Sequence, residues 1–203
     1  MSRPTYPIHT ARLALRPVTP ADLDDVHAFQ SHPEVARWAL GGEPRARSLT
    51  EASVTAMAGE DALHAEGDCL TLAAVSAGTV IGTVELVWRS ESDQTAELGY
   101  VFHPGHGGRG LATEAAAALL DWGFGEFGLH RVYARCHARN EPSARLMTRL
   151  GMRREAHHVA AYRFRGEWTD QLVFAVLSHE WHALRRQPPG HPSDHQPASP
   201  GQR

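Results

Sequence analysis

The chain has 203 residues, of which 42% are hydrophobic and 21% charged, and its formal net charge is −3. This is the composition of an ordinary globular domain, and the length is sufficient for one substantial core. The longest apolar run, Ala115–Leu120, is far too short to span a bilayer. No apolar stretch follows Arg3 near the start, so we expect no leader, no membrane segment and a cytoplasmic location.

Residue usage is unusual in several respects. All 20 basic side chains are arginine and Asn140 is the single asparagine, which a G/C-rich genome explains. Cys69 and Cys136 lie too far apart to suggest a disulfide framework or a zinc site, and we expect both to be buried. The 14 histidines show no metal-ligand spacing, so we expect no bound metal.

The last part of the chain differs in composition from the rest. Residues 187–203 are rich in Pro, Gly, Ser, His and Gln and carry no apolar residue larger than alanine. Such a segment cannot bury enough surface to offset its ordering entropy, which predicts a disordered tail. No Pro/Gly-rich linker divides residues 1–186, so we expect a single domain there, as a monomer or homodimer.

The first half of this domain predicts one strand, two helices and a group of three strands. Arg12–Val18 alternates with period two and reads as a strand. Thr19–Asp22 has the form of a helix start, with a capping hydroxyl and a proline at the first helical position. A second helix is expected from Ser48 to Glu66. Short connections then join three apolar strands into an antiparallel meander: Cys69–Ser76, Val80–Trp88 and Thr95–Phe102.

The second half alternates helices and strands. A glycine-rich turn precedes a helix from Leu111 to about Phe127, which carries an apolar stripe. A strand, a short helix and two more strands are expected after it: Arg131–His137, Pro142–Leu150, Val159–Arg165 and Asp170–Leu177. A meander followed by a crossover helix predicts a mixed α/β domain of the α+β kind.

Four glycines occur between Gly105 and Gly110, where a strand ends and a helix begins. Glycine lets the backbone approach a ligand and take positive φ, and a helix start offers unpaired N–H groups at the positive end of its dipole. We interpret the loop as an anion site, most naturally for phosphate, because a simple tight turn needs fewer glycines.

Two nucleotide-binding motifs fit this loop poorly. A P-loop needs lysine and Ser/Thr after its last glycine, where Leu111 and Ala112 stand, which excludes a nucleoside triphosphatase. Gly105-x-Gly107-x-x-Gly110 matches the dinucleotide fingerprint. That motif, however, belongs to a parallel βαβ unit, and here an antiparallel meander comes first. An NADP-dependent oxidoreductase is therefore a distant alternative.

Several separated motifs occur in a fixed order: Ala96-Glu97-Leu98-Gly99-Tyr100, Gly107–Ala115, Gly128–Arg131, Asn140-x-x-Ser143-x-Arg145 and Leu150–Glu155. Together they resemble the GNAT superfamily of N-acetyltransferases, most closely its RimJ/RimL-type branch, named for enzymes that acetylate the N-termini of ribosomal proteins. The resemblance covers nearly all of the folded region. It implies a mostly antiparallel, centrally splayed sheet flanked by helices, with acetyl-CoA as the acetyl donor.

The family's acetyl-CoA motif, (Gln/Arg)-x-x-Gly-x-(Gly/Ala), falls on Gly107–Ala112, with Gly107 in place of the long polar side chain. The resemblance implies that backbone amides hold the pyrophosphate, namely those of Gly108, Arg109, Gly110, Leu111, Ala112 and Thr113. The Arg109 side chain either adds charge to the phosphates or is a solvated loop arginine.

The resemblance also places the pantetheine arm between two splayed strands. Tyr100, Val101 and Phe102 would lie along the thioester, with a backbone N–H polarising its carbonyl. Asn140 would contact the CoA arm or cap the following helix. Ser143 and Arg145 complete the implied cofactor set.

Charge along the chain agrees with an anionic cofactor. Residues 103–154 carry eight arginines and four acidic residues, so positive charge is concentrated there in a chain of net charge −3. A nucleic-acid partner is the weaker interpretation, because the overall balance is acidic and no recognition motif occurs.

The expected chemistry is direct transfer of acetyl from the thioester to an amine. At pH 7, removing a proton costs about 1 to 1.4 kcal/mol for an α-amine but roughly 4.6 kcal/mol for a lysine side chain. Glu97, on the strand facing the thioester, is our candidate general base, and the other interpretation is a strand carboxylate paired with an arginine. Glu85 and His103 are alternative bases.

Many relatives protonate the leaving thiolate with a tyrosine seven residues after the asparagine, a position that Met147 holds here. Ser143 is the remaining candidate donor, or else only a helix-start hydroxyl. Two functions follow: an N-acetyltransferase of peptide α-amines or small amines, or a CoA-binding regulatory module without catalysis. No motif identifies the acceptor.

Overall fold

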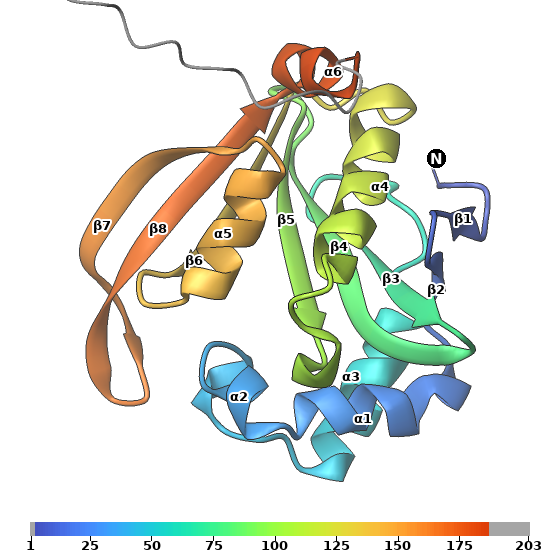
Figure 1. Cartoon of the computed structure of the whole chain (residues 1–203), viewed down its shortest axis with the longest axis vertical. Helices are drawn as coiled ribbons and strands as arrows, with labels where there is room; N and C mark the ends of the chain where they lie inside the picture. The colour runs from blue at the N-terminus through green and yellow to red at the C-terminus, as the bar shows by residue number, and fades with distance from the viewer. Residues whose placement is uncertain (1–2, 187–203) are drawn as a thin grey trace, which may run out of the picture.

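A single eight-stranded sheet forms the centre of residues 3–186, the part of the chain that the structure, a computed structural model, describes. Its strand order is β1-β2-β3-β4-β5-β6-β8-β7 (Figure 1). The strands are β1 (Ile8–His9), β2 (Ala14–Pro17), β3 (Cys69–Ser76), β4 (Thr79–Ser90), β5 (Thr95–Phe102), β6 (Arg131–His137), β7 (Arg153–Phe164) and β8 (Glu167–Leu177). The α-helices are α1 (Leu23–Gln30), α2 (Pro33–Ala36), α3 (Arg47–Met57), α4 (Leu111–Gly125), α5 (Glu141–Arg149) and α6 (Ser178–Arg186).

The predicted fold class is confirmed, because helices flank a mixed sheet in which every neighbouring pair except β5–β6 is antiparallel. The predicted disordered tail, residues 187–203, lies outside the described residues, so the domain boundary stays a prediction. None of the helices within residues 3–186 is long and apolar enough to cross a membrane.

Three local predictions were wrong. The second helix ends at Met57 instead of Glu66, because the chain turns at Gly59 and Glu60 then accepts a backbone hydrogen bond from Thr71 of β3. Strand β7 begins at Arg153, earlier than expected, because its polar first half is held by backbone pairing with β8 and carries no alternating pattern. Cys69 is only partly buried, whereas Cys136 is buried, and both are free thiols.

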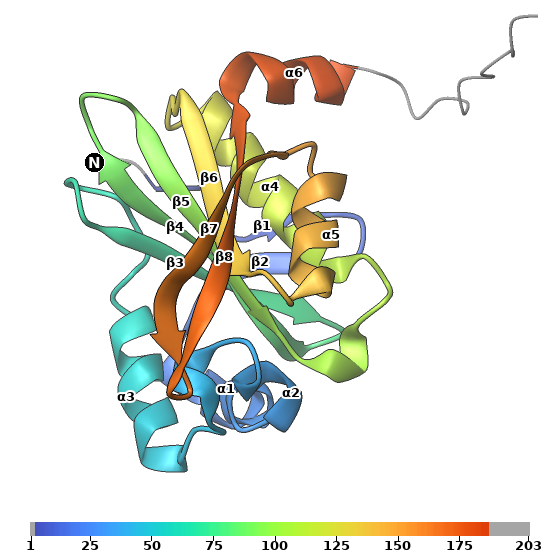
Figure 2. The same ribbon diagram turned by 90° about the vertical axis from the view of Figure 1, so that its left-hand side faces the viewer.

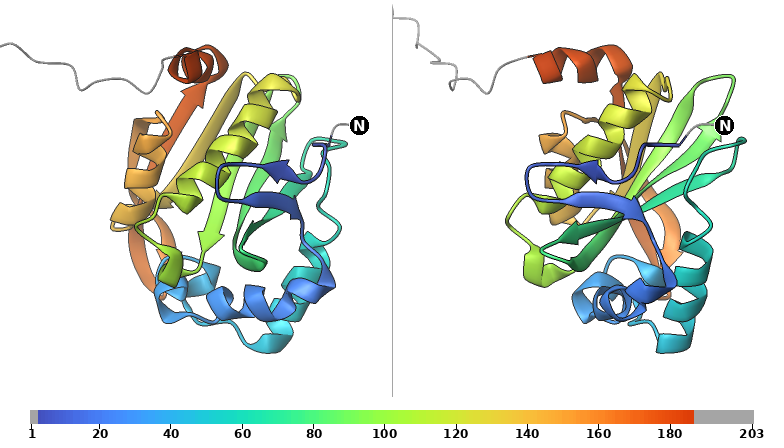
Figure 3. Two further views of the ribbon diagram at one scale, coloured as in Figure 1. Left: turned by 45° about the vertical axis from the view of Figure 1, so that its right-hand side comes forward. Right: turned by 90° about the vertical axis from the view of Figure 1, so that its right-hand side faces the viewer.

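Apolar residues form one core on each face of the sheet. On one face, α4 and α5 pack against the strands, with Leu119 and Met147 fully buried in the larger core (Figures 1 and 3). On the other face, α1 and α3 bury a smaller core that includes Phe29 and Val54. Figure 2 shows that α1 and α3 lie only at the lower end of this second face.

The pairing between β5 and β6 stops partway along the two strands. The parallel register runs from Thr95 with Arg131 to Glu97 with Tyr133, and β6 then continues its pairing with β8 alone. The strands diverge below this point (Figure 1). We call the space between residues 98–102 of β5 and the lower part of β6 the opening.

A buried ion pair holds the corner between β2 and α1. The carboxylate of Asp22, 6% exposed, accepts two hydrogen bonds of 2.7 Å from the Arg16 guanidinium and one of 2.8 Å from the Thr19 N–H. Burial alone raises the pKa of Asp22, but these donors outweigh it and hold the pKa below its usual range. The helix start predicted at Thr19–Asp22 is therefore confirmed in part. The main capping group is the Asp22 carboxylate, which accepts from the Thr19 N–H.

Because a lowered pKa means that the ionised Asp22 stabilises the fold, this contribution is present at neutral pH and is lost as pH falls through the lowered pKa. We expect Asp22→Asn to lower the free energy of unfolding by about 2 kcal/mol at pH 7 and by progressively less as the pH falls below 3.8, the ordinary pKa of an aspartate. Urea unfolding at pH 7 and at pH values below 3.8 measures this. Asp24→Asn is the control, because Asp24 pairs with Arg47 at an exposed site and its loss should cost under about 0.5 kcal/mol. An equal loss of unfolding free energy in Asp22→Asn and Asp24→Asn would contradict the stabilising role assigned to the buried Asp22 carboxylate.

Candidate functional site

The edge of β5 that faces the opening presents unpaired backbone groups. The register with β4 is antiparallel, and His103 N–H bonds to Ile81 of β4 at 2.8 Å, so odd-numbered residues of β5 direct their N–H and C=O toward β4. The N–H and C=O of Tyr100 and Phe102 and the C=O of Leu98 consequently point into the opening, whereas the Leu98 N–H belongs to the last parallel pair with Tyr133. Val101 was predicted to lie along a ligand, but its backbone bonds to β4 and its side chain packs against the smaller core.

The glycine loop lies between the lower end of β5 and the start of α4. Gly108 and Gly110 adopt positive φ of 71° and 75°, which favours glycine at both positions. At Gly107 the backbone passes so close to Pro104 that a Cβ would lie 2.9 Å from the Pro104 carbonyl oxygen. The turn therefore needs its glycines for structural reasons as well.

Backbone donors accumulate at this loop. Within residues 3–186, no protein group accepts a hydrogen bond from the N–H groups of residues 108–113, and the first N–H of the helix to bond is that of Glu114, to Gly110 at 3.0 Å. Gly107 N–H, by contrast, bonds to Pro104 at 2.8 Å and is not available. Six consecutive free N–H groups at the positive end of a 15-residue helix form a cradle for an anion.

Sequence reasoning assigned no role to Arg12, which the fold brings to this cradle. Its guanidinium donates to the Arg109 carbonyl at 2.8 Å and pairs with Glu114 in the first turn of α4. Only proximity in the fold reveals this contact, since the residues are about a hundred positions apart. The Arg109 side chain itself forms no ion pair within the described part of the chain, so both of its predicted roles stay open.

Strand β6 and helix α5 border the opening on the other side. The Asn140 side-chain oxygen accepts from Ser143 N–H at 3.2 Å, which gives Asn140 its predicted capping role. The Tyr100 hydroxyl reaches across from β5 and lies 2.7 Å from Ser143 Oγ. Burial raises the pKa of Tyr100 above its usual range, so this hydroxyl stays protonated. Arg145 is exposed and pairs with Glu141 at 2.9 Å.

Two residues near α5 have no chemical role in this arrangement. Met147, which stands where many relatives carry a tyrosine, is fully buried in the core. Cys136 is buried, and burial raises the pKa of its thiol, so it is a poor nucleophile at neutral pH.

Glu97 lies where β5 and β6 are last paired, and arginines surround its carboxylate. Arg89 donates to it at 2.8 and 3.0 Å, and Arg135 does so at the same two distances. The Tyr133 hydroxyl adds a bond of 3.2 Å. Burial raises the pKa of Glu97, but the two guanidinium groups outweigh burial and lower it. The geometry thus favours the ion-paired interpretation of Glu97 over that of a general base.

Glu85 has the opposite environment. It lies opposite Gly99 in the register, and its side chain rests against Gly99, where a Cβ would overlap the carboxylate. Burial, followed by the charges of Glu60 and Glu97, raises the pKa of Glu85. Alternation along β4 places Glu85 on the face away from α4, because its neighbours Val84 and Leu86 belong to the larger core.

His103, the other alternative base, follows β5 directly. Burial and the nearby His32 and His106 lower its pKa, so the ring is neutral at pH 7. Its Nδ1 accepts from Gly105 N–H at 3.0 Å, which places the proton of the neutral ring on Nε2. His103 can therefore donate a hydrogen bond through Nε2 but has no free nitrogen to accept a proton.

The cradle, the opening beside it and the splayed sheet define a class of proteins that bind an extended anionic ligand between two parallel strands. A family profile described as the acetyltransferase (GNAT) domain matches residues 12–153. The chain therefore belongs to the GNAT family, whose members are acetyl-CoA-dependent acyltransferases of the N-acetyltransferase type. The residues that would hold acetyl-CoA fit it, because the free N–H groups of the cradle match a pyrophosphate.

Similar proteins support the assignment over most of the chain. The uncharacterized N-acetyltransferase YnaD of Bacillus subtilis is 43% identical over 89 residues, and this alignment spans 44% of this chain and about half, 52%, of that relative. The uncharacterized N-acetyltransferase p20 of Bacillus licheniformis is 26% identical over 86% of this chain and 97% of its own length. A GNAT-family acetyltransferase structure from Bacillus anthracis superposes with a TM-score of 0.74 at 28% identity, covering 84% of this chain and 98% of that one.

We expect Gly108→Asp to weaken CoA binding at least a hundredfold, because it adds a negative charge beside the cradle. Gly78→Asp is a matched control: Gly78 also has positive φ, of 86°, and open space around its Cα, but it lies in the β3–β4 turn. Calorimetric titration with CoA measures both variants, and thermal unfolding checks that backbone strain affects them alike. Equal CoA affinity in the two variants would overturn the assignment of the cradle.

Proposed function

We propose that the protein transfers the acetyl group of acetyl-CoA to the primary amine of a peptide N-terminus or a small molecule. The observation that carries this proposal is the run of six free N–H groups at the start of α4, beside the unpaired edge of β5. Acetyl-CoA supplies the acetyl group as a thioester. The motif around Ala96–Tyr100 supports the RimJ/RimL-type branch, and we place the protein in the cytoplasm, where its two free thiols persist.

The chain's own groups divide the binding of the donor between them. The N–H groups of residues 108–113 hold the pyrophosphate, and the charge of Arg12 lies beside them. Tyr100 and Phe102 direct their N–H groups into the opening, where either can donate to the thioester carbonyl and stabilise negative charge that develops on its oxygen. Asn140 and Arg145 border the opening from α5, and the Asn140 amide nitrogen is left for the CoA arm.

Glu85 acts as the general base in this proposal. Its carboxylate lies against Gly99, one residue before the Tyr100 N–H, and on the face of the sheet away from α4. Burial and like charges raise its pKa, which brings its proton affinity closer to that of an attacking amine. An α-amine needs about 1 to 1.4 kcal/mol for deprotonation at pH 7, so it demands less of this base than a lysine side chain does.

Ser143 is the proposed proton donor to the leaving thiolate. Its Oγ lies 2.7 Å from the Tyr100 hydroxyl, which holds the serine in position at the border of the opening. The raised pKa of Tyr100 keeps that hydroxyl protonated, so it can return a proton to Ser143 after transfer. Tyr100 is thus a positioning residue in addition to its backbone role.

The first test is release of CoA thiol from acetyl-CoA with a panel of peptides and small amines. We expect turnover with several α-amines and much slower turnover with peptides whose only amine is a lysine side chain, because of the larger deprotonation cost. Tight CoA binding without turnover across the panel would contradict the proposal and favour a CoA-binding regulatory module.

The second test separates the two acidic candidates. We expect Glu85→Gln to lower kcat at least tenfold at pH 7, with a remaining activity that rises with pH only as the amine itself loses its proton, because the variant has no carboxylate to accept that proton. Near pH 9 the loss should shrink, since α-amines are then already deprotonated. Glu97→Gln should instead lower thermal stability and leave the shape of the pH profile unchanged. The reverse pattern would restore Glu97 as the base.

A further inference from the structure

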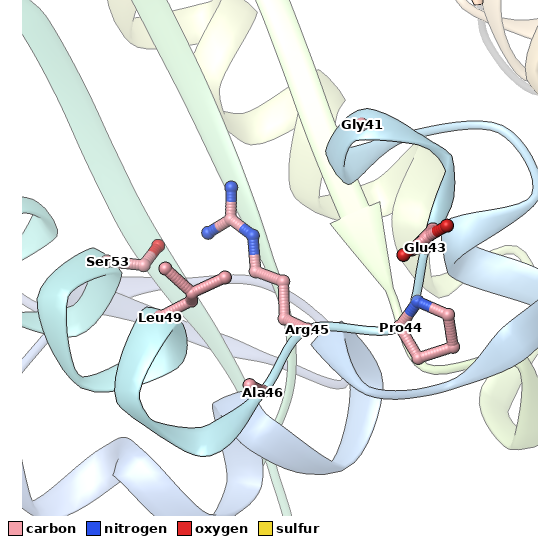
Figure 4. A pocket seen from close by; sticks show the side chains of 7 residues that line it. All are labelled: Gly41, Glu43, Pro44, Arg45, Ala46, Leu49 and Ser53. Carbon is pink, nitrogen blue, oxygen red and sulfur yellow. The ribbon is translucent and has the colours of Figure 1, made fainter. Parts of the chain in front are cut away.

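A cavity of about 710 Å³ lies between the end of α2 and the start of α3. Its wall combines one guanidinium, one carboxylate, one hydroxyl and several apolar groups: Gly41, Glu43, Pro44, Arg45, Ala46, Leu49 and Ser53 (Figure 4). In Figure 4 the Arg45 side chain projects between Ser53 and Leu49 on one side and Gly41 and Glu43 on the other. We call it the Arg45 cavity.

The guanidinium of this cavity is held in place by a buried residue. Gln30, 4% exposed, accepts from Arg45 Nη1 at 3.3 Å through its side chain, and its carbonyl accepts from Arg45 N–H at 3.1 Å. The Gln30 amide in turn donates to Ser53 Oγ at 3.2 Å. A neutral amide fixes Arg45 without neutralising it. Within residues 3–186, Arg45 forms no ion pair, not even with Glu43 on the facing wall.

The segment that precedes the cavity lies across the lower end of the opening. The rings of His32 and His103 are 5.4 Å apart, which links α2 to the end of β5. The rings of Trp38 and His137 are 5.2 Å apart, which links the same segment to the end of β6. Figure 1 shows α2 below the gap between the two strands. The Arg45 cavity therefore directly follows, along the chain, a segment that contacts the lower ends of both strands.

Other arginines near this segment also lack acidic partners. Arg37 stacks on Trp38, with its guanidinium carbon 4.7 Å from the ring centroid. The stem of Arg165, from the β7–β8 hairpin, lies against Gly42, where a Cβ would overlap it. Neither arginine forms an ion pair with any residue that the structure describes. Within the cavity wall Arg45 and Glu43 balance each other in formal charge, so the excess of positive charge comes from Arg37 and Arg165 beside it, which disfavours a polyamine and favours an anion.

We propose that the Arg45 cavity binds a carboxylate of the acceptor, so that the preferred acceptor is an amine that also carries a carboxylate. This rests on the proposed function, because the segment before the cavity contacts the lower ends of the two strands between which transfer would take place. Arg45 offers a fixed, planar set of donors that matches a carboxylate, and Pro44 and Leu49 offer an apolar wall for a short hydrocarbon chain. The carboxylate belongs either to a free amino acid or to an acidic peptide.

The test compares acceptors that differ only in charge. The pairs are alanine with alanine amide, which lacks the free carboxylate, and Ala-Glu-Ala amide with Ala-Gln-Ala amide, and spermidine is a cationic probe. For the wild-type protein we expect kcat/KM to be at least tenfold higher for the carboxylate in one of the pairs, and the pair that shows it identifies the source. Equal kcat/KM within both pairs, or a preference for spermidine, would overturn the proposal.

Variants locate the effect at the cavity. Arg45→Gln should remove the preference for carboxylate and leave KM for acetyl-CoA within twofold, whereas Arg45→Lys should keep part of it. Arg47→Gln is the matched control, because Arg47 lies two residues away but pairs with Asp24 outside the cavity. If Arg45→Gln and Arg47→Gln behave alike while thermal unfolding shows both folded, the assignment to Arg45 is wrong.

Binding without turnover keeps the two proposals separate. In the presence of CoA, the wild-type protein should bind N-acetylalanine at least tenfold more tightly than N-acetylalanine amide, or acetyl-Ala-Glu-Ala amide at least tenfold more tightly than acetyl-Ala-Gln-Ala amide, and Arg45→Gln should not. Calorimetric titration measures this even if no acceptor is acetylated. If no acceptor causes release of CoA thiol, the proposed function is contradicted. If acidic and neutral products bind equally tightly, the assignment of the carboxylate site to the Arg45 cavity is contradicted.

Discussion

The end of the β5–β6 pairing at Glu97 is the constraint on which the rest of the site depends. Its carboxylate binds Arg89 of β4 and Arg135 of β6, and so ties together three strands at the last point where they are adjacent. Beyond it β6 pairs with β8, and the edge of β5 is left with free donors and acceptors. Free strand edges favour intermolecular pairing. Here the same groups become a binding edge, because α4 and α5 support the two diverging strands from one face and α2 lies below them.

Glu85 and Glu97 lie on adjacent strands, and their different surroundings shift their pKa values in opposite directions. Glu97 and Glu85 lie on the same face of the sheet, two register pairs apart. Two guanidinium groups lower the pKa of Glu97, whereas burial and like charges raise that of Glu85. A carboxylate held by four charged hydrogen bonds stabilises structure, and one without a cation can exchange a proton. The base that we propose therefore lies on β4, although β5 carries the more recognisable motif.

Positive charge is used in two different ways around the opening. At the cradle the donors are mainly backbone N–H groups, and Arg12 reinforces them from a distant part of the chain while it is neutralised by Glu114. At the lower end, Arg45 is fixed by the neutral Gln30 and keeps its full charge. Because the chain has only arginine as its basic residue, both places offer planar donors suited to paired oxygens. The cradle and the Arg45 cavity thus both favour anionic groups, within a protein of net negative charge.

The sequence by itself determined the strands of the meander, the glycine loop, the capping role of Asn140 and the family, because period-two alternation, glycine spacing and helix-start residues act locally. It did not determine the first half of β7, whose polar residues are strand only through pairing with β8, or the short α2, whose position depends on contacts with His103 and His137. Nor did it separate Glu85 from Glu97, or reveal Arg12 and Arg45. Charge pairing and burial join residues far apart in the chain, so only the tertiary structure could decide which arginine is neutralised and which carboxylate is free.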